Sequence, residues 1–457
     1  MRIAAIVSVG EEILAGDIVD TNAAEIAKEL RALGWTVRSI RTVGDDVPVI
    51  AAALRDAAAG SELVVVTGGL GPTRDDLTRE GLAEATADTL VEDESAWHAI
   101  QDYFARIGRV MNPTNRIQAQ RPSRARIVPN PLGTAPGLDA TIGSARVFVL
   151  PGVPMEMRAM LRGTVLPAVA AGAGGAQPLA RARVHAHGVP ESTAGEWIAE
   201  WMGAGKDPFV GITVSGGILT VSVTARTPAE SARDRVASIA DEVWKRFGNH
   251  AFGRDGVTIE EALIAALRAR GARLALAESC TGGLAARLVT RVPGASDVFV
   301  QGIVPYSNAA KVRWLGVTQW DLRIHGAVSP TVARQMAFAV AASAGVDCGV
   351  STTGVAGPGG GTPSKPVGRV EFGAYWRGQV YDRTTTFVGD RESIQLRAAR
   401  FALDLARRAA LGTLRDELPP ARPGLDDRRA RSVGGRNFDD FFVRRSTPSL
   451  TLTAWVC

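Results

Sequence analysis

The chain has 457 residues, of which 46% are hydrophobic and 22% are charged, and its formal net charge is +5 at pH 7. This length exceeds one ordinary core, so we expect two to three soluble, globular domains, and no apolar run is long enough to span a membrane. The basic residues are not interleaved with aromatics, which argues against nucleic-acid binding, and three cysteines give neither a disulfide framework nor metal-ligand spacing, which indicates a cytoplasmic protein.

The N-terminal region alternates between strand and helix patterns. Apolar runs predict strands at 3–9, 37–40 and 63–66, and periodic apolar positions predict helices at about 20–33 and 49–59. This alternation predicts a parallel sheet with helices on both faces. Ligands bind such sheets beyond the carboxyl ends of the strands.

The third of these strands runs into a glycine-rich segment at 67–78. Backbone N–H groups of its glycines could approach phosphate oxygens, and Thr73 could add a hydroxyl. Asp75 and Asp76 could bind a hard cation that bridges diphosphate oxygens. Alternatively, one of these aspartates only caps the next helix, and the spacing does not separate the two interpretations.

Residues 1–170 resemble the molybdopterin-binding (MogA/MoeA-like) fold in its CinA branch. The resemblance is carried by VGEEILAGDIVDTN at 9–22, TGGLGPTRDDLT at 67–78, NPLGTAPG at 130–137 and LPGVPMEM at 150–157. The CinA branch implies a metal-dependent ADP-ribose pyrophosphatase, with Mg, Mn or Co as the metal, that yields AMP and ribose 5-phosphate. The molybdopterin fold implies pterin binding instead, and the glycine motif does not discriminate the two ligands.

With this resemblance, specific residues are expected around one N-terminal cleft. The metal candidates are Asp75, Asp76 and Glu11, with Glu12 as a weaker one. Asn130 and Gly137 are expected to line the same cleft. The expected phosphate-binding residues are Thr67, Gly68, Gly69, Gly71, Pro72, Thr73 and Thr134.

The middle of the chain has a different pattern of predicted strands and helices. Small residues at 170–176 predict a linker, and residues 178–251 combine a helix near Trp197, two strands near 209–226 and a helix near 229–247. This region resembles the small α+β module, likened to KH domains, of full-length CinA proteins. It lacks a basic GXXG loop, so we expect a spacer or dimerisation role rather than RNA binding. Two histidines without a third ligand, His185 and His187, are expected to be structural.

Residues 274–284 predict a strand, a tight turn and a helix, after a helix at 259–270. Ser279 stands in the turn and could be a nucleophile if a base lies near. The helix start would offer free N–H groups to an anion. The simpler interpretation is a glycine turn, and Cys280 competes with Ser279 because a helix start lowers a thiol pKa.

Two more polar segments follow. Residues 301–311 predict a strand that ends in a loop with Tyr306 and Lys311, and a partly desolvated lysine is neutral enough to accept a serine proton. The glycine-rich segment 353–361 cannot form a helix or an interior strand, so it suits close approach of a ligand. A flexible surface loop would give the same pattern, but the strand at 369–376 that follows favours order.

Six segments in this order resemble the C-terminal domain of the CinA family, the PncC-type nicotinamide-nucleotide amidase domain, over residues 258–414. They are AESCTGG at 277–283, YSNAAK at 306–311, GAVS at 326–329, GVAGPGGG at 354–361, KPVG at 365–368 and GDR at 389–391. The resemblance implies hydrolysis of the carboxamide of nicotinamide mononucleotide (NMN) to nicotinate mononucleotide and ammonia, without a cofactor. The nicotinamide-nucleotide amidase in the same chain favours ADP-ribose as the N-terminal ligand by association, because ADP-ribose is a breakdown product of the same cofactor pool.

The resemblance also implies roles for single residues. Ser279 would be the nucleophile, Lys311 its base, and Tyr306 would assist proton transfer. Backbone N–H groups of Cys280, Thr281 or the 354–361 loop could stabilise the oxyanion. The expected substrate-binding residues include two arginines, Arg391 and Arg397, which would hold the phosphate or orient the dyad. The others are Cys280, Thr281, Gly282, Asn308, Gly357 and Gly359.

The sequence therefore predicts an α/β protein with three domains, at 1–170, 178–251 and 258–414, and a disordered tail at 415–457. We expect a cytoplasmic homodimer that acts on small nucleotides, with no membrane partner. A competing hypothesis is a nucleotide- or pterin-binding accessory protein of competence or damage induction, without turnover. The intact Ser279, Tyr306 and Lys311 argue against it.

Overall fold

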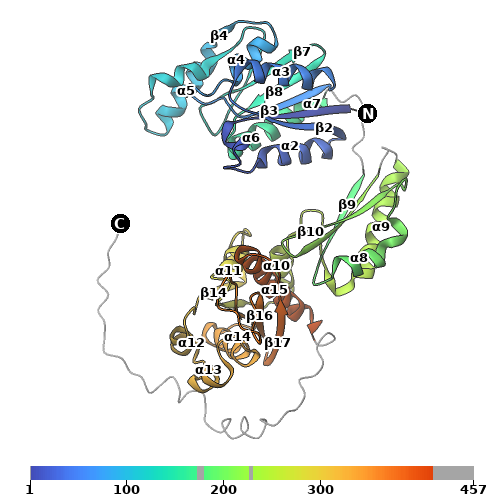
Figure 1. The fold of residues 1–457 in the computed structure, drawn as a ribbon, viewed down its shortest axis with the longest axis vertical. Helices are drawn as coiled ribbons and strands as arrows, with labels where there is room; N and C mark the ends of the chain where they lie inside the picture. The colour runs from blue at the N-terminus through green and yellow to red at the C-terminus, as the bar shows by residue number, and fades with distance from the viewer. Residues whose placement is uncertain (1, 172–179, 226–229, 415–457) are drawn as a thin grey trace. The chain divides into compact units, whose positions relative to one another are not determined.

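The computed structural model describes residues 2–171, 180–225 and 230–414 (Figure 1). These residues form three larger sheets, of six, four and five strands, and one two-stranded ribbon. The predicted tail at 415–457 and most of the predicted linker at 170–176 lie outside the described residues. Of the described helices, none combines the length and the apolar character that crossing a bilayer requires.

Contacts between residues gather the chain into two compact units. The first comprises the described residues within Met1–Ala182, Ile198–Gly211 and Ser222–Glu242, and the second comprises Arg183–Trp197, Ile212–Val221 and residues 243–414. The residues predicted as a middle module, 178–251, are thus divided between the two units.

The N-terminal sheet has the strand order β2-β1-β3-β8-β7-β6. Its first four strands are parallel, as predicted, and β7 and β6 form an antiparallel edge that the sequence pattern did not indicate. The strands are β1 (Arg2–Val9), β2 (Trp35–Val43), β3 (Leu63–Thr67), β6 (Arg126–Val128), β7 (Gly137–Ile142) and β8 (Ala145–Leu150), and the separate ribbon pairs β4 (Leu90–Glu92) with β5 (Gln120–Pro122).

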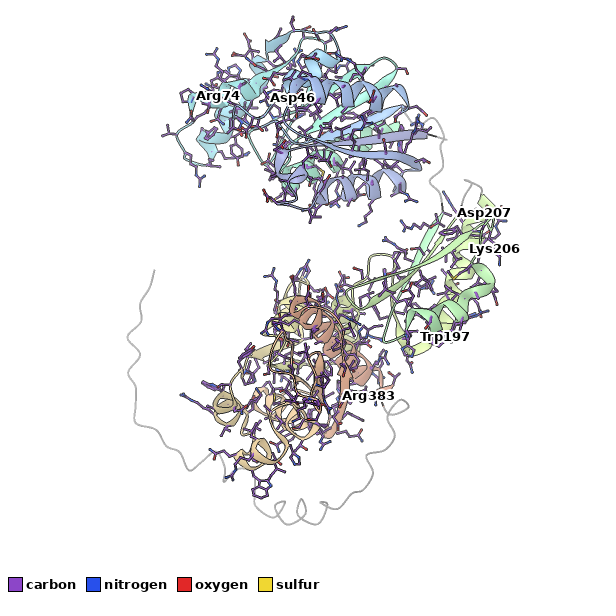
Figure 2. All side chains as sticks on the ribbon, in the orientation of Figure 1. Asp46, Arg74, Trp197, Lys206, Asp207 and Arg383 are labelled. Carbon is purple, nitrogen blue, oxygen red and sulfur yellow. The ribbon has the colours of Figure 1, made fainter. Side chains whose placement is uncertain are left out.

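Helices cover both faces of this sheet because its central strands are apolar on both sides. In β3, Val64 and Val66 pack into one core with α3, and Leu63 and Val65 pack into another with α2. Aspartates cap both helices, and Asp46 at the start of α3 is labelled in Figure 2. The helices are α1 (Glu11–Leu14), α2 (Thr21–Ala32), α3 (Val47–Ala59), α4 (Thr78–Ala85), α5 (Glu94–Arg106), α6 (Pro154–Met160) and α7 (Leu166–Ala171), with a π-helical turn at Leu161–Val165.

The four-stranded sheet has the order β10-β11-β9-β12 and confirms an α+β arrangement. Both histidines of β9 make structural hydrogen bonds, as expected: His187 Nδ1 lies 3.0 Å from a carboxylate oxygen of Asp404, and His185 bonds Thr220 and the carbonyl of Asp255. The elements are β9 (Arg181–His187), α8 (Glu191–Ile198), β10 (Phe209–Ser215), β11 (Ile218–Thr224), α9 (Glu230–Phe247) and β12 (Ala251–Arg254).

The C-terminal sheet has the order β14-β13-β15-β16-β17, with β14, β13 and β15 parallel. Alternate residues of β13 face different cores: Leu274 and Leu276 pack with α10, α11 and α15, whereas Ala275 and Ala277 pack with α14. The strands are β13 (Leu274–Glu278), β14 (Phe299–Ile303), β15 (Cys348–Gly354), β16 (Arg369–Trp376) and β17 (Gln379–Thr386). The helices are α10 (Ile259–Ala269), α11 (Leu284–Thr290), α12 (Asn308–Leu315), α13 (Gln319–His325), α14 (Pro330–Ala344) and α15 (Arg391–Leu411).

The carboxyl ends of three parallel strands therefore meet at one edge of this sheet. Ser279 follows β13, the loop to Lys311 follows β14, and the glycine-rich loop 355–361 follows β15. Three segments that are far apart in the sequence are brought together here by strand order alone.

Candidate functional site

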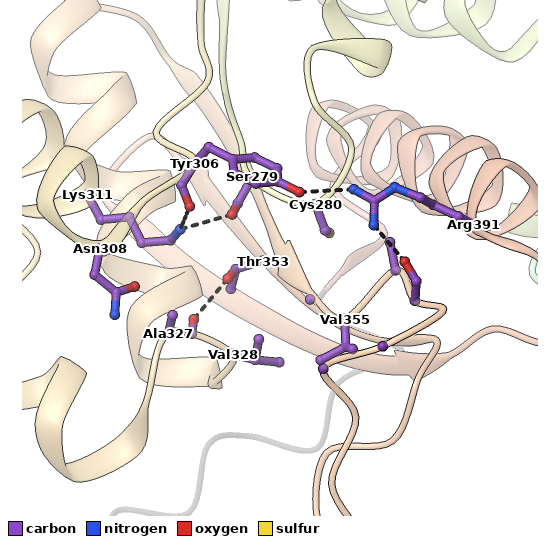
Figure 3. A pocket seen from close by; sticks show the side chains of 15 residues that line it. Ser279, Cys280, Tyr306, Asn308, Lys311, Ala327, Val328, Thr353, Val355 and Arg391 are labelled. Carbon is purple, nitrogen blue, oxygen red and sulfur yellow. Dashed lines mark hydrogen bonds between the residues drawn. The ribbon is translucent and has the colours of Figure 1, made fainter.

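A cavity of about 290 Å³ lies at this edge of the C-terminal sheet (Figure 3). Most of the predicted site residues line it: Ser279, Cys280, Tyr306, Asn308, Lys311, Gly357, Gly359 and Arg391. Thr281, Gly282 and Arg397 are not in the lining. The Thr281 hydroxyl is buried against Thr352, at 2.8 Å, and Arg397 instead donates to the Val388 carbonyl at 2.8 Å.

Ser279 and Lys311 lie in direct contact, with 2.9 Å between Oγ and Nζ. Two backbone carbonyls complete the surroundings of the amine, Pro305 O at 3.0 Å and Tyr306 O at 3.1 Å. In the charged form the three N–H groups of the amine can donate to these three oxygens; in the neutral form two N–H groups serve the carbonyls and the lone pair faces the serine hydroxyl. Figure 3 shows the contacts of the amine with Ser279 and with the Tyr306 carbonyl.

The surroundings of Lys311 favour the neutral form that a general base needs. Its side chain is only 1% exposed, and burial lowers the pKa of its amine. Among the described residues, no carboxylate forms an ion pair with Lys311 that would hold it protonated. The same desolvation acts on Cys280: burial raises the pKa of that thiol to about 12. At neutral pH Cys280 therefore carries little of the thiolate form that acts as a nucleophile.

The start of α11 is not available to a substrate anion, contrary to the expectation from the sequence. The carboxylate of Glu278, the last residue of β13, accepts hydrogen bonds from the N–H groups of Gly283, Ala285 and Ala286 at 3.1, 2.9 and 2.8 Å. Sequence reasoning missed this residue, although an acid directly before a strand-to-helix turn is a signal for such capping.

Arg391 joins two loops across the cavity. Its guanidinium donates to the Gly357 carbonyl at 2.7 Å and to the Tyr306 hydroxyl at 2.9 Å (Figure 3). The Tyr306 hydroxyl therefore points at Arg391, and only the backbone oxygen of Tyr306 contacts Lys311. This geometry gives no support to the predicted assistance of Tyr306 in proton transfer.

Two contacts around the cavity were not indicated by the sequence. Gln395 donates from Nε2 to the carbonyl of Cys280 at 2.8 Å, which ties α15 to the turn that carries Ser279. The Thr353 hydroxyl lines the cavity and donates to the Ala327 carbonyl at 2.9 Å. Both contacts join segments distant in the sequence, so no local pattern indicates them.

A second cavity, of about 440 Å³, lies at the carboxyl ends of β1 and β3 in the N-terminal sheet. Most of the predicted residues line it: Thr67, Gly68, Gly69, Gly71, Pro72, Asp75, Asp76, Thr134 and the weaker candidate Glu12. Glu11, Thr73, Asn130 and Gly137 are not in the lining. The buried guanidinium of Arg79 fixes the glycine loop by donating to the carbonyls of Leu70 and Gly71, each at 2.8 Å.

The carboxylates at this second cavity do not form a ready metal site. The carboxylate of Asp76 accepts the N–H groups of Gly71 and Thr73 at 2.7 and 2.9 Å and also the Thr73 hydroxyl, so it fastens its own turn. Asp45, which sequence reasoning missed, also lines the cavity. Its pKa is raised by burial and by the charges of Glu12 and the two aspartates. Over residues 2–171, 180–225 and 230–414, no three His, Cys, Asp or Glu side chains are placed to hold one metal ion.

The chain is similar to known proteins in both of its large domains. A family model described as "CinA C-terminal domain" matches residues 257–410, and one described as "Probable molybdopterin binding domain" matches residues 5–171. A CinA-like protein of Desulfosudis oleivorans is 42% identical over 81% of this chain and 90% of its own length. A CinA-like protein of an Anaeromyxobacter species is 42% identical over 88% of this chain and 98% of its own. The crystal structure of the protein CinA from Thermoplasma acidophilum, of unknown function, is 42% identical over 36% of this chain and 96% of its own, with a TM-score of 0.34.

Proposed function

The chain belongs to the CinA family, and from that premise we propose that its C-terminal domain hydrolyses the carboxamide of NMN to nicotinate mononucleotide and ammonia. The observation that carries this proposal is the contact of 2.9 Å between Ser279 Oγ and a buried Lys311 amine. A serine with a neutral amine at its hydroxyl is suited to attack an amide, because the amine accepts the serine proton as the new bond forms.

The reaction follows from this geometry in two halves. Ser279 Oγ attacks the carboxamide carbon while its proton passes to Lys311 Nζ. The tetrahedral intermediate collapses when Lys311 returns that proton to the leaving nitrogen, which departs as ammonia and leaves an ester on Ser279. Water then attacks the ester while Lys311 accepts a proton from it, and the second intermediate collapses when Lys311 returns that proton to Ser279 Oγ, which releases nicotinate mononucleotide. The two carbonyls at Lys311 hold its amine beside Ser279 Oγ through both halves.

Arg391 is the residue best placed to bind the substrate phosphate. Of the residues that line this cavity, Lys311 and Arg391 are the cationic ones, and Lys311 is committed to Ser279. Replacing Arg391 by methionine should raise the KM for NMN by roughly tenfold or more, because a charged hydrogen bond to the phosphate is lost. The kcat should change little. Steady-state kinetics of ammonia release give both constants.

Arg397→Met is the matched control, since Arg397 lies on the same helix, donates to a backbone carbonyl and is outside the cavity lining. It should leave the KM unchanged. Nicotinamide riboside, which lacks the phosphate, should be equally poor with Arg391→Met and with the parent chain. An equal loss with both substrates would show that Arg391 orients the dyad instead.

We infer a second activity for the N-terminal domain, the hydrolysis of ADP-ribose to AMP and ribose 5-phosphate. Its support is the position of the glycine loop Thr67–Gly71 at the strand ends, in a cavity large enough for a nucleotide. Among the described residues that line this cavity, none is Lys, Arg or His, so a diphosphate must bring a counter-ion with it. Binding of a pterin phosphate is the other candidate for the same cavity.

Replacing Asp75 by asparagine should weaken ADP-ribose hydrolysis by roughly tenfold or more if its carboxylate helps to hold that counter-ion. Ammonia release from NMN should be untouched. The assay measures AMP with Mg, Mn and Co in turn, and Asp56→Asn, an exposed aspartate paired with Arg41, serves as the control. A parallel fall of both activities would indicate a damaged fold. If a folded parent chain binds ADP-ribose but releases no AMP with any of the three metals, the domain is a binding protein without turnover.

A further inference from the structure

The backbone N–H groups of the turn that carries Ser279 differ in the acceptors they bind. Ser279 N donates to Thr352 O at 2.9 Å, Gly282 N to Ser279 O at 3.2 Å and Leu284 N to Thr281 O at 3.1 Å. The Glu278 carboxylate accepts hydrogen bonds from three other N–H groups, those of Gly283, Ala285 and Ala286. Within the described residues, the N–H groups of Cys280 and Thr281 donate to no backbone carbonyl.

The Glu278 carboxylate is therefore the anchor of this turn. The side chain is 2% exposed and belongs to the last residue of a central strand, so it cannot relax into solvent. Its two oxygens reach across the turn to the start of α11 and fix the distance between strand and helix. Three N–H donors satisfy its charge, which makes a buried carboxylate tolerable at this position.

We propose that Glu278 is a positioning residue: it holds the 279–283 turn so that the N–H group of Cys280, a residue that lines the cavity, faces the oxygen that becomes negative when Ser279 attacks. This inference rests on the proposed role of Ser279 as nucleophile, but it does not depend on which amide is the substrate. An oxyanion needs donors already fixed in place, and donors on a turn are fixed only if the turn is. Glu278 does so without touching the substrate.

The glycine-rich loop is the alternative source of donors. Residues Ala356, Gly357, Gly359 and Gly360 also line the cavity. If their N–H groups bind the oxyanion, Glu278 has only a structural role. The two possibilities predict different reaction rates for a correctly folded variant of Glu278.

The test is labelling of Ser279 by an alkyl fluorophosphonate, followed by intact mass spectrometry of the full chain. In this reaction the serine oxygen bonds to phosphorus, fluoride leaves, and the serine proton passes to Lys311. The phosphoryl oxygen gains charge in the oxyanion site, so the rate reports the donors without any amide substrate. Ser279→Ala should not be labelled.

Glu278→Gln should be labelled roughly a hundredfold more slowly than the parent chain, yet to completion. A purely structural defect would instead lower the fraction of protein that can be labelled and leave the rate of that fraction unchanged. Glu371→Gln is the matched control: Glu371 is a buried carboxylate of β16 in the same sheet, held by Arg369 and Thr384, and it makes no contact with the 279–283 turn. Its labelling rate should stay close to that of the parent.

If Glu278→Gln does not fold, Glu278→Asp replaces it, because the shorter acid keeps the charge but cannot reach all three N–H groups. Full labelling of either folded variant at the parent rate would overturn the proposal and assign the donors to the 356–360 loop. A parent chain that is labelled but releases no ammonia from NMN would overturn the proposed substrate and leave the role of Glu278 standing. A parent chain that is not labelled would overturn both.

Discussion

Replacing Ser279 by alanine should abolish ammonia release from NMN, to below about one part in 10⁴ of the parent rate. Without Oγ no ester can form, and Lys311, which is 1% exposed, has no other hydroxyl to activate at 2.9 Å. Coupled measurement of ammonia, with nicotinate mononucleotide identified by chromatography, gives the rate. Thermal unfolding of the variant shows whether the fold is retained.

Cys280→Ala is the control for this substitution, because Cys280 is the adjacent competitor and lines the same cavity. Its high thiol pKa leaves little thiolate at neutral pH, so the alanine variant should keep most of the activity. Full activity of Ser279→Ala combined with loss in Cys280→Ala would transfer the role of nucleophile to the thiol.

Replacing Lys311 by methionine should lower kcat by at least roughly a hundredfold, because the serine loses its base. Methionine keeps the volume of the buried stem, so the cavity is not opened. The pH profile adds a second test. Burial lowers the pKa of the Lys311 amine, and only the neutral amine is active, so the parent rate should rise with pH through that lowered pKa and then level off.

The methionine variant should lose this rise along with the activity. Lys365→Met is the control, since Lys365 is a half-buried lysine of the same unit that lies outside the cavity lining and whose amine donates to the His325 carbonyl at 2.6 Å. Its pH profile should match that of the parent. A Lys311 variant that changes only the KM would be a phosphate-binding residue and not a base.

The positions of the two key residues could be predicted because they depend on strand order and local turns. Ser279 and Lys311 each follow a parallel strand, and the carboxyl ends of neighbouring parallel strands meet at one edge. A strand, a polar turn and a helix can be recognised from a few residues. The α/β fold class and the CinA resemblance were confirmed by the sheets and by the family matches.

The directions of the side chains could not be predicted, because they depend on partners far away in the sequence. The Tyr306 hydroxyl is held by Arg391, 85 residues later, and this contact turns it away from Lys311. The carbonyl of Cys280 is held by Gln395, 115 residues later. Residue types alone indicate that these groups share a site, but they do not indicate which atoms meet.

The partners of the acidic residues could not be predicted either. Glu278 is the last residue of β13 and Asp76 lies in the loop after β3, where a ligand is expected, and both bind backbone N–H groups of the adjoining turns. A carboxylate near a glycine turn can serve a ligand or the turn itself, and the choice depends on the backbone geometry of the turn. The alternative left open by the sequence, an aspartate that caps the next helix, does not describe Asp76: α4 begins after Leu77 without a side-chain cap, and the Asp76 carboxylate binds the N–H groups of Gly71 and Thr73.

Ammonia release from NMN by the full-length parent chain is the measurement that tests the central proposal most directly. We expect ammonia and nicotinate mononucleotide in equal amounts, without added metal, at a rate that rises with pH. A folded chain whose Ser279 reacts with the fluorophosphonate but which forms neither product would contradict the proposal and show that this serine acts on another substrate.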